Sequence, residues 1–208
     1  MANRSPRIKT YNYAEGIDSK IEILQNILSD NLSWLDHSFG LATPVKRNEK
    51  DRLIEIPVAF VDNTSDPIDL RPFPDDLCRS YSFWDMKDPA VIKYSEGQEF
   101  SSRKYSVIQY EIACIFVVDC KKIDNQLTYK ETRSHLRDEI FKVFEDYSTD
   151  IPFAFYMKNI FERDINKIFD GYTLDEPEKI ISPYYAFRVE GLLEFKRKCP
   201  ISYTYSVL

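Results

Sequence analysis

Glycine is scarce in this sequence, with five residues among 208. Loops that cradle phosphate need clustered glycines, because their backbone N–H groups must approach the anion closely. Here Gly16, Gly40, Gly97, Gly171 and Gly191 are scattered singly. The scarcity therefore argues against the glycine-rich nucleotide-binding enzymes.

Cysteine and histidine are also few. The four cysteines show no CxxC spacing, and His37 and His135 are the two histidines. Zinc sites and disulfide frameworks usually carry closely spaced ligands. A serine nucleophile would be expected in a GxSxG motif, which the chain does not contain. We therefore expect no catalytic group, no metal and no cofactor, and cysteines that stay reduced.

Long apolar runs are missing, and positive charge is in deficit. No apolar run follows the basic residues of 1–9, so we expect neither a secretory signal nor a membrane span. The 28 Lys and Arg against 34 Asp and Glu give a formal net charge of −6. A general grip on nucleic acid by phosphate neutralisation is therefore not expected.

Aromatic residues, by contrast, are plentiful: 14 Tyr, 14 Phe and 2 Trp. Tyrosine and tryptophan supply large contact areas at subunit interfaces. Since no pocket chemistry accompanies them, we interpret the aromatic residues on expected loops and chain ends as interface candidates. These are Tyr81, Phe83, Trp84, Tyr184, Tyr185, Tyr203 and Tyr205.

The length predicts one domain over 14–199, preceded by an extended arm at 1–13 and followed by a tail at 200–208. Apolar residues at helical spacing predict helices over 14–30 and 129–147. The stretch 151–172 fits a strand in its first part and a helix, closed by Gly171, in its second.

Strands are predicted where apolar residues alternate or run together: 53–61, 68–70, 81–85, 104–121 and 184–195. Pro57 suggests an edge strand or a bulge, because proline cannot donate to a ladder. We expect a turn with apolar anchors over 31–40, a charged loop over 46–52, and a long loop over 62–103 in which only short pairings occur. The pattern predicts an α+β fold whose mainly antiparallel sheet is flanked by two or three helices.

One pattern allows an enzymatic alternative. Asp75, Glu194 and Lys196 could form a PD-ExK arrangement, in which two carboxylates hold Mg²⁺ and the lysine orients a water. More than half of the chain separates the two parts, whereas such enzymes usually place them on adjacent strands. A metal-dependent nuclease therefore remains the alternative hypothesis.

Several segments that are dispersed along the sequence indicate a more specific class of protein. They are Trp34 with 39–42, then 57–60, 74–76, 80–85 and 169–172, and finally 183–188 leading to Cys199. Together these segments resemble bacteriophage neck proteins with a tail-terminator-like fold, of the kind found in crAss-like phages. The similarity extends from about Ile17 to Cys199 and is a pattern of apolar anchors and element order, not a catalytic fingerprint.

The resemblance implies a structural virion protein of the head-to-tail connector. Its copies would form a closed twelve-fold or six-fold ring that joins the portal to neighbouring neck or tail proteins. DNA would only pass through the lumen, and no membrane would be involved. The protein would be found in the virion neck or tail, and in the host cytoplasm during assembly.

Overall fold

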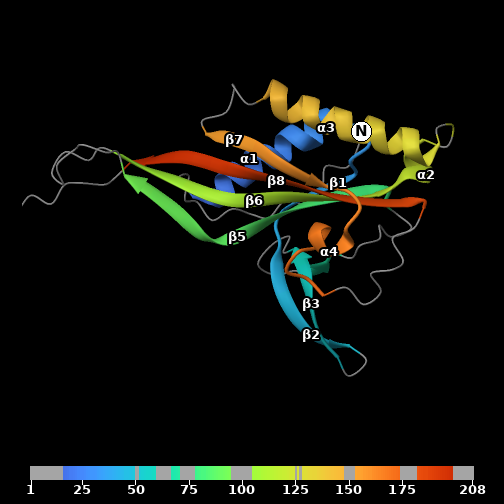
Figure 1. Ribbon diagram of the computed structural model, residues 1–208, viewed down its shortest axis with the longest axis horizontal. Coiled ribbons are helices and arrows are strands. Elements are labelled where there is room, and N and C mark those ends of the chain that lie inside the picture. Colours follow the sequence, from blue (N-terminus) through green and yellow to red (C-terminus); the bar gives the residue numbers. More distant parts are fainter. Residues whose placement is uncertain are drawn as a thin grey trace, which may run out of the picture.

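The structure, a computed structural model, describes residues 16–49, 52–59, 67–70, 78–94, 105–124, 126, 128–147, 153–173 and 182–198. Two sheets and their covering helices make up this part of the chain (Figure 1). In chain order the elements are α1 (Ile17–Asn31), β1 (His37–Leu41), β2 (Thr43–Glu49), β3 (Arg52–Ala59), β4 (Ile68–Asp69), β5 (Ser80–Tyr94), β6 (Tyr105–Asp119), α2 (Cys120–Ile123), α3 (Tyr129–Asp146), β7 (Ala154–Phe161), α4 (Ile165–Ile168) and β8 (Tyr184–Lys198).

The larger sheet has five strands in the order β1-β5-β6-β8-β7. β1 pairs with β5 in parallel, whereas the other three pairs are antiparallel. The smaller sheet, β2-β3-β4, is wholly antiparallel. The prediction of an α+β fold with a mainly antiparallel sheet is thus confirmed.

α1 and α3 cover one face of the five-stranded sheet, which we call the helix face (Figure 1). β6 alternates as its sequence predicts, with Ile112, Cys114 and Phe116 on this face. On the neighbouring strand Phe187 stacks on Phe116, with ring centroids 4.8 Å apart. The buried cluster on this face extends over most of the length of β6 and β8, from Val118 and Tyr185 to Ile108 and Phe195.

Both predicted long helices are confirmed, and local chemistry explains where α3 begins. The Thr128 hydroxyl accepts a hydrogen bond from the Glu131 N–H, while the Glu131 carboxylate accepts one from the Thr128 N–H. This capping box satisfies two backbone donors that the first helical turn leaves without partners. Leu136, Ile140 and Val143 then recur on the buried side of the helix.

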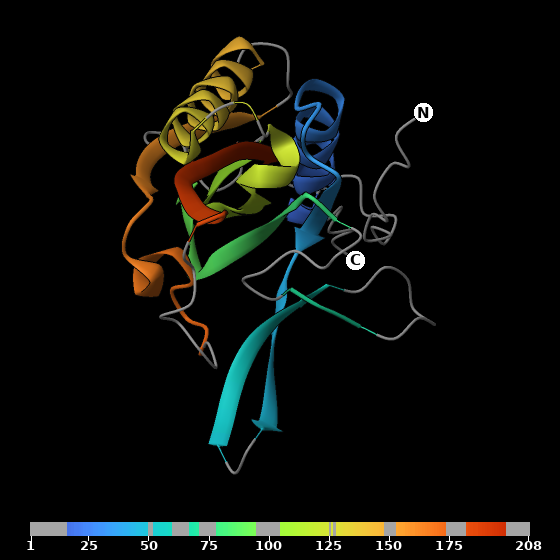
Figure 2. The ribbon, with the colours of Figure 1, turned by 90° about the vertical axis from the view of Figure 1, so that its right-hand side faces the viewer.

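On the opposite side of the five-stranded sheet, the second face, the described residues cover one end only. There α4 and the smaller sheet contribute Phe169, Ala59 and Leu70 to a cluster with Phe83 and Ile115. Beyond this base, β2 and β3 extend away from the body as a hairpin (Figure 2). Among the described residues, one sheet face is therefore covered over most of its length and the other at one end.

The prediction of a loop over 46–52 is wrong. Residues Thr43–Glu49 form β2, which pairs with β3 along its whole length. From Pro44 to Glu49 exposed positions alternate with half-buried ones, but residues 46–49 are polar on both sides of the strand. The sequence therefore lacks the apolar–polar alternation that marks a half-buried strand.

Pro57 lies in β3, which is the central strand of the smaller sheet and not an edge strand. Its register partner in β2 is Pro44, and its carbonyl accepts the Leu70 N–H on the β4 side. The two prolines therefore form a non-hydrogen-bonded pair, in which neither strand needs an N–H donor. Their pairing reconciles proline with a central strand.

The expected loop over 62–103 is interrupted by a long strand. β5 covers Ser80–Tyr94, where only 81–85 was expected to be extended. The pairing within 68–70 is confirmed as β4. The predicted turn over 31–40 is confirmed only at its start, because His37–Leu41 forms β1.

The ambiguous stretch 151–172 contains both predicted elements. β7 is followed by the single helical turn of α4, and the chain then turns at Gly171. Gly171 has φ +90°, a backbone conformation that favours glycine. The proposed arm 1–13 and the tail 200–208 lie outside the described residues. Within the described parts of the chain, no helix is long and apolar enough to cross a membrane.

Candidate functional site

The second face of the sheet changes character from one row of residues to the next. Strand register places Phe83, Ile115, Arg188 and Phe161 in one row across β5, β6, β8 and β7. The next rows are Asp85–Ala113–Glu190–Asn159 and Lys87–Glu111–Leu192–Tyr156. Successive rows are about 7 Å apart, since two residues separate them along each strand. A covered apolar end thus gives way to ionic groups and then to an exposed row.

Arg188 is the centre of the ionic groups, and its side chain has no exposed surface. Its Nη2 lies 2.9 Å from Asp85 Oδ2, and its Nε donates to Glu190 Oε1 at 3.1 Å. Tyr172, in the turn after α4, donates its hydroxyl to Asp85 Oδ1 at 3.1 Å. Because a buried guanidinium must be paired with anions, these contacts account for its place inside the fold.

Lys87 extends the network to the surface. Its Nζ lies 3.2 Å from Glu190 Oε1 and 3.0 Å from Asp170 Oδ2. Asn159 of β7 donates to the second oxygen of Glu190 at 3.4 Å. The network, which we define as Asp85, Lys87, Asp170, Tyr172, Arg188 and Glu190, therefore ties β5, β8 and the turn after α4 together.

The pKa shifts describe a network of fixed charges. Burial would raise the pKa of Glu190, but hydrogen bonds from Lys87 and Asn159 outweigh it and hold that pKa below its ordinary value. The hydrogen bond between Lys87 and Asp170 lowers the pKa of Asp170 and raises that of Lys87. Burial raises the pKa of Tyr172, which stays a neutral donor. The pKa values of Glu190, Asp170, Lys87 and Tyr172 thus all move away from neutral pH, which does not favour proton transfer there.

Next to this network lies the surface that we call the open face: Lys87, Val91, Glu111, Tyr156 and Leu192. Tyr156 is 55% exposed and Val91 51% exposed, although both are strand residues of the larger sheet. Glu111 pairs with Lys158 of β7 at 3.0 Å on the same surface. Figure 1 shows α4 and the smaller sheet under the other end of the second face. Apolar and charged groups are therefore available together to a binding partner.

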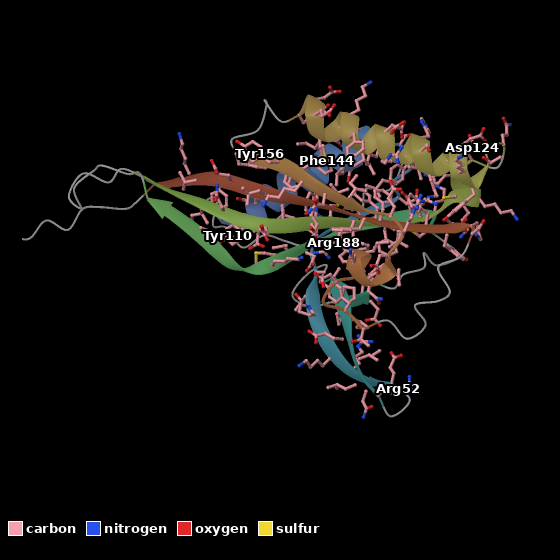
Figure 3. All side chains as sticks on the ribbon, in the orientation of Figure 1. Arg52, Tyr110, Asp124, Phe144, Tyr156 and Arg188 are labelled. Atoms are coloured by element: carbon pink, nitrogen blue, oxygen red, sulfur yellow. The ribbon has the colours of Figure 1, made fainter. Side chains whose placement is uncertain are left out.

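A second exposed surface lies on the smaller sheet. Register places Leu53, Lys46, Asn48, Pro44 and Ile68 on one side of β2-β3-β4, and we call this side the hairpin strip. Leu53 is 69% exposed. Figure 3 shows Arg52, the neighbour of Leu53, at the far end of the hairpin from Arg188. The exposed leucine is thus held away from the body.

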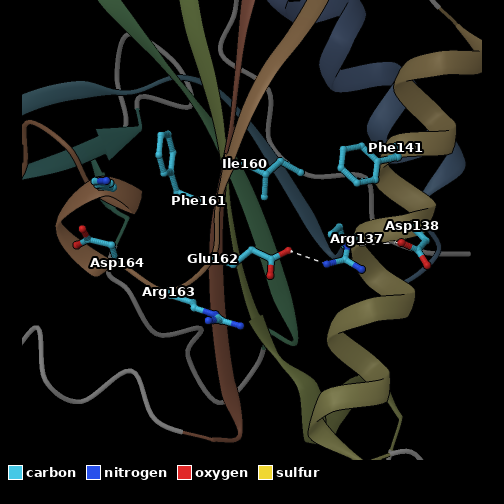
Figure 4. Close-up of a pocket in the computed structure, with 9 residues that line it drawn as sticks. Arg137, Asp138, Phe141, Ile160, Phe161, Glu162, Arg163 and Asp164 are labelled. Atoms are coloured by element: carbon cyan, nitrogen blue, oxygen red, sulfur yellow. Dashed lines mark hydrogen bonds and ion pairs between the residues drawn. The ribbon is translucent and has the colours of Figure 1, made fainter.

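A pocket of about 580 Å³ lies where α3 meets β7 and α4 (Figure 4). Phe141, Ile160 and Phe161 supply its apolar lining. Glu162 accepts hydrogen bonds from Arg137 and from Arg133, each at 3.4 Å. Because these charges already compensate one another, the pocket resembles a seam between a helix and an edge strand more than a site built for a ligand.

The structure places four of the predicted interface residues in the core. Tyr81, Phe83, Trp84 and Tyr185 are buried, with Phe83 and Trp84 fully enclosed. Their aromatic area therefore stabilises the folded chain itself and is not offered to a second subunit. For Tyr81, Phe83 and Trp84 the prediction failed because 81–85 was expected to be a short pairing within a long loop, whereas it begins the long strand β5.

Tyr184 begins β8 and is half-buried, and its carbonyl accepts the hydroxyl of Tyr129. Tyr203 and Tyr205 lie outside the described residues. Tyr156, which the sequence interpretation placed in the ambiguous stretch, is instead exposed on a strand. Only its position on the outward side of β7, opposite Phe155, could have indicated this.

The structure brings together two of the three nuclease candidates. Glu194 and Lys196 lie two residues apart on β8 and so share the second face, and Glu194 accepts a hydrogen bond from Gln109. Asp75 lies outside the described residues. Within the described ranges, no three His, Cys, Asp or Glu side chains are grouped to hold a metal ion. The nuclease hypothesis stays a prediction, to be tested by plasmid cleavage with Mg²⁺ and the Asp75→Ala variant.

Sequence reasoning missed the ionic network. Its sequence signal is two pairs of opposite charges at alternate positions, Asp85 with Lys87 and Arg188 with Glu190, since residues two apart on a strand share a face.

No known family model matches the chain, and no curated protein is detectably similar to it.

Proposed function

We propose that this chain is a structural assembly protein that forms a closed homo-oligomeric ring in the neck of a bacteriophage. The ring would join the portal to the tail and let DNA pass through its lumen. The resemblance of the dispersed segments to phage neck proteins supports the setting. The distribution of exposed apolar side chains supports the mode of assembly.

That distribution is the observation that carries the proposal. The described residues include four large apolar side chains that are exposed, and these divide between two surfaces. Leu53 and Ile68 lie on the hairpin strip, whereas Val91 and Tyr156 lie on the open face. Two different surfaces suit a head-to-tail contact, in which one surface meets the other on the next copy, and such contacts generate rings when the rotation closes.

The sheet edges favour contact through faces over a continuous sheet. β7 has an irregular register between Met157 and Asn159, at Lys158. On the other side of the sheet β1 pairs with β5 only as far as Trp84, and beyond it β5 has an irregular register between Lys87 and Val91, a stretch that contains Pro89. Bulges, lysines and prolines hinder the addition of another strand.

The test is the assembly state of the full chain, alone and with a purified portal ring. We expect closed rings by negative-stain microscopy, and a mass by mass photometry that corresponds to twelve or six copies. The portal should lower the protein concentration at which rings form. A chain that stays monomeric at high concentration, and also in the presence of the portal, would contradict the proposal.

A further inference from the structure

Each of the two exposed surfaces combines apolar side chains with charged ones, and a lysine on one can face a glutamate on the other. We infer that the hairpin strip of one copy docks on the open face of the next copy, with Leu53 packed between Tyr156 and Leu192 and with Lys46 beside Glu111. This inference rests on the proposed ring, because it names the contact that would build it.

Neither surface can be covered by the other surface of the same molecule. The hairpin extends away from the body, and its end lies far from the five-stranded sheet in both ribbon views (Figures 1 and 2). The open face lies on the sheet itself, beyond the ionic network. A contact between them therefore requires two copies.

The strand registers give the spacing of the groups on each surface. On the strip, Leu53 of β3 pairs with Asn48, and Lys46 is the next residue of β2 on that side. On the open face, Leu192 of β8 pairs directly with Glu111 of β6. The Leu192–Glu111 pair is directly opposite, about 5 Å apart, whereas Leu53 and Lys46 are diagonal neighbours, about 7–8 Å apart. Because a lysine side chain is long enough to span this difference, placing leucine on leucine brings the Lys46 ammonium within reach of Glu111.

The charge of Glu111 is accessible. Glu111 has 61% of its side chain exposed, and its partner Lys158, on the edge strand β7, has 44% exposed. An exposed ion pair of this kind contributes little to folding, so exchange of its lysine for one from a neighbour costs little. Leu53, by contrast, gains by leaving water, since burying a leucine side chain is favourable.

The ionic network fixes the geometry of this contact. Lys87 belongs both to the network and to the open face, and Glu190 lies in the row next to Leu192 and Tyr156. A rigid receiving surface loses little conformational entropy when the hairpin binds. The network is therefore a positioning element for the docking surface.

Site-specific cross-linking tests the contact directly. Leu53→Cys and Tyr156→Cys are made separately in full chains that also carry Cys199→Ser, because Cys199 lies outside the described residues. Cys78, Cys114 and Cys120 are buried. After treatment with a short bismaleimide, we expect a covalent dimer when the two variants are mixed, and none with either variant alone.

Each other outcome overturns the inference. A dimer of Leu53→Cys with itself would mean that hairpins meet hairpins. Rings without a mixed cross-link would refute this contact and leave the proposed function intact. A parent chain that forms no assembly, alone or with portal, would refute both. Since both positions are exposed, neither substitution should prevent folding, and circular dichroism checks this.

A charge exchange gives an independent measurement. Lys46→Glu and Glu111→Lys should each weaken association about threefold to tenfold, and the double variant should recover most of the loss. Lys142→Glu, on the exposed side of α3, is the matched control and should leave association unchanged. If the double variant is as weak as the two losses combined, the pairing of Lys46 with Glu111 is wrong.

Discussion

The two faces of the five-stranded sheet are made by the same strands and serve different ends. On the helix face, apolar side chains run from Tyr185 to Phe195 along β8 under α1 and α3. On the second face, the same strand presents Ala186 to the core, then Arg188 and Glu190 to an ionic network, then Leu192 to the open face. Alternation along one strand thus separates a surface for stability from a surface for contact.

The uncovered part of the second face is confined to one end of the sheet and has a definite limit. The uncovered part begins where the buried Arg188 ends the apolar cluster, so the open face is not a general weakness of the core. A sheet face left bare at random would expose many apolar side chains, whereas here Tyr156 and Val91 lie among charged neighbours. Substitutions on the two faces should therefore have separable effects on folding and on assembly.

The largest effect on stability is expected at Arg188, which lies between the covered end of the second face and the open face. Arg188→Ala should lower the free energy of unfolding by about 3–5 kcal/mol, because Asp85 and Glu190 would be left without their buried cation. Chemical denaturation followed by circular dichroism measures this. Combining Arg188→Met with Asp85→Asn should recover part of the loss. If Arg188→Ala lowers the free energy of unfolding by less than about 1 kcal/mol, the ionic network does not stabilise the fold as proposed.

Two adjacent leucines of β8 give a matched comparison of the faces. Leu193 is fully buried on the helix face, while Leu192 is half-buried on the open face. Leu193→Ala should cost about 2–5 kcal/mol of stability, since it leaves a cavity in the core. Leu192→Ala should cost less than about 1 kcal/mol and should weaken ring formation instead. Equal costs in the monomer would show that the open face is part of the core.

A smaller effect on stability is expected at Gly191 of β8, where the neighbouring strand β7 approaches closely. A Cβ added there would lie 2.4 Å from the Phe155 ring and 2.8 Å from the Tyr156 carbonyl oxygen. Gly191→Ala should therefore destabilise the fold by about 1–3 kcal/mol, through overpacking and a shift of β7. Thermal unfolding measures the change. Gly191→Ala with Phe155→Leu should relieve part of it, and an unchanged midpoint in the single variant would contradict the close approach.

Sequence alone predicted the helix face well. The alternation of β6 and the helical spacing of α1 and α3 follow directly from burial against a continuous apolar cluster. Where one side of an element is dry and the other is wet, the pattern in the sequence is strong. These elements were therefore predictable in type and nearly in extent.

The second face was harder for the same physical reason. β2 has few buried positions, and the later part of β5 carries Lys87 and Pro89, so both stretches have the composition of loops. The alternation of β8 places Arg188 on its polar side, but its burial depends on α4 and Asp85, which are distant in sequence. Burial by residues that are distant in the sequence produces no periodic pattern in the local sequence.

The smallest effect is expected on the stability of the fold at acidic pH, where the ionic network and the open face should behave differently. The pKa values of Glu190 and Asp170 lie below their ordinary values of 4.5 and 3.8, so below about pH 5 the unfolded chain binds protons more readily than the folded chain. Their contribution to stability is thus complete above that pH and is lost as the pH falls through the folded pKa values.

We expect Glu190→Gln to lower the free energy of unfolding at pH 7 and to reduce its dependence on pH between 5 and 3. Urea unfolding at pH 7, 5, 4 and 3 measures both. Glu111→Gln, which removes an exposed carboxylate from the open face, is the control and should leave the slope unchanged, because a surface pair contributes little. If the two variants change the slope equally, the network is no more important to folding than the surface beside it, and the boundary between the two regions disappears.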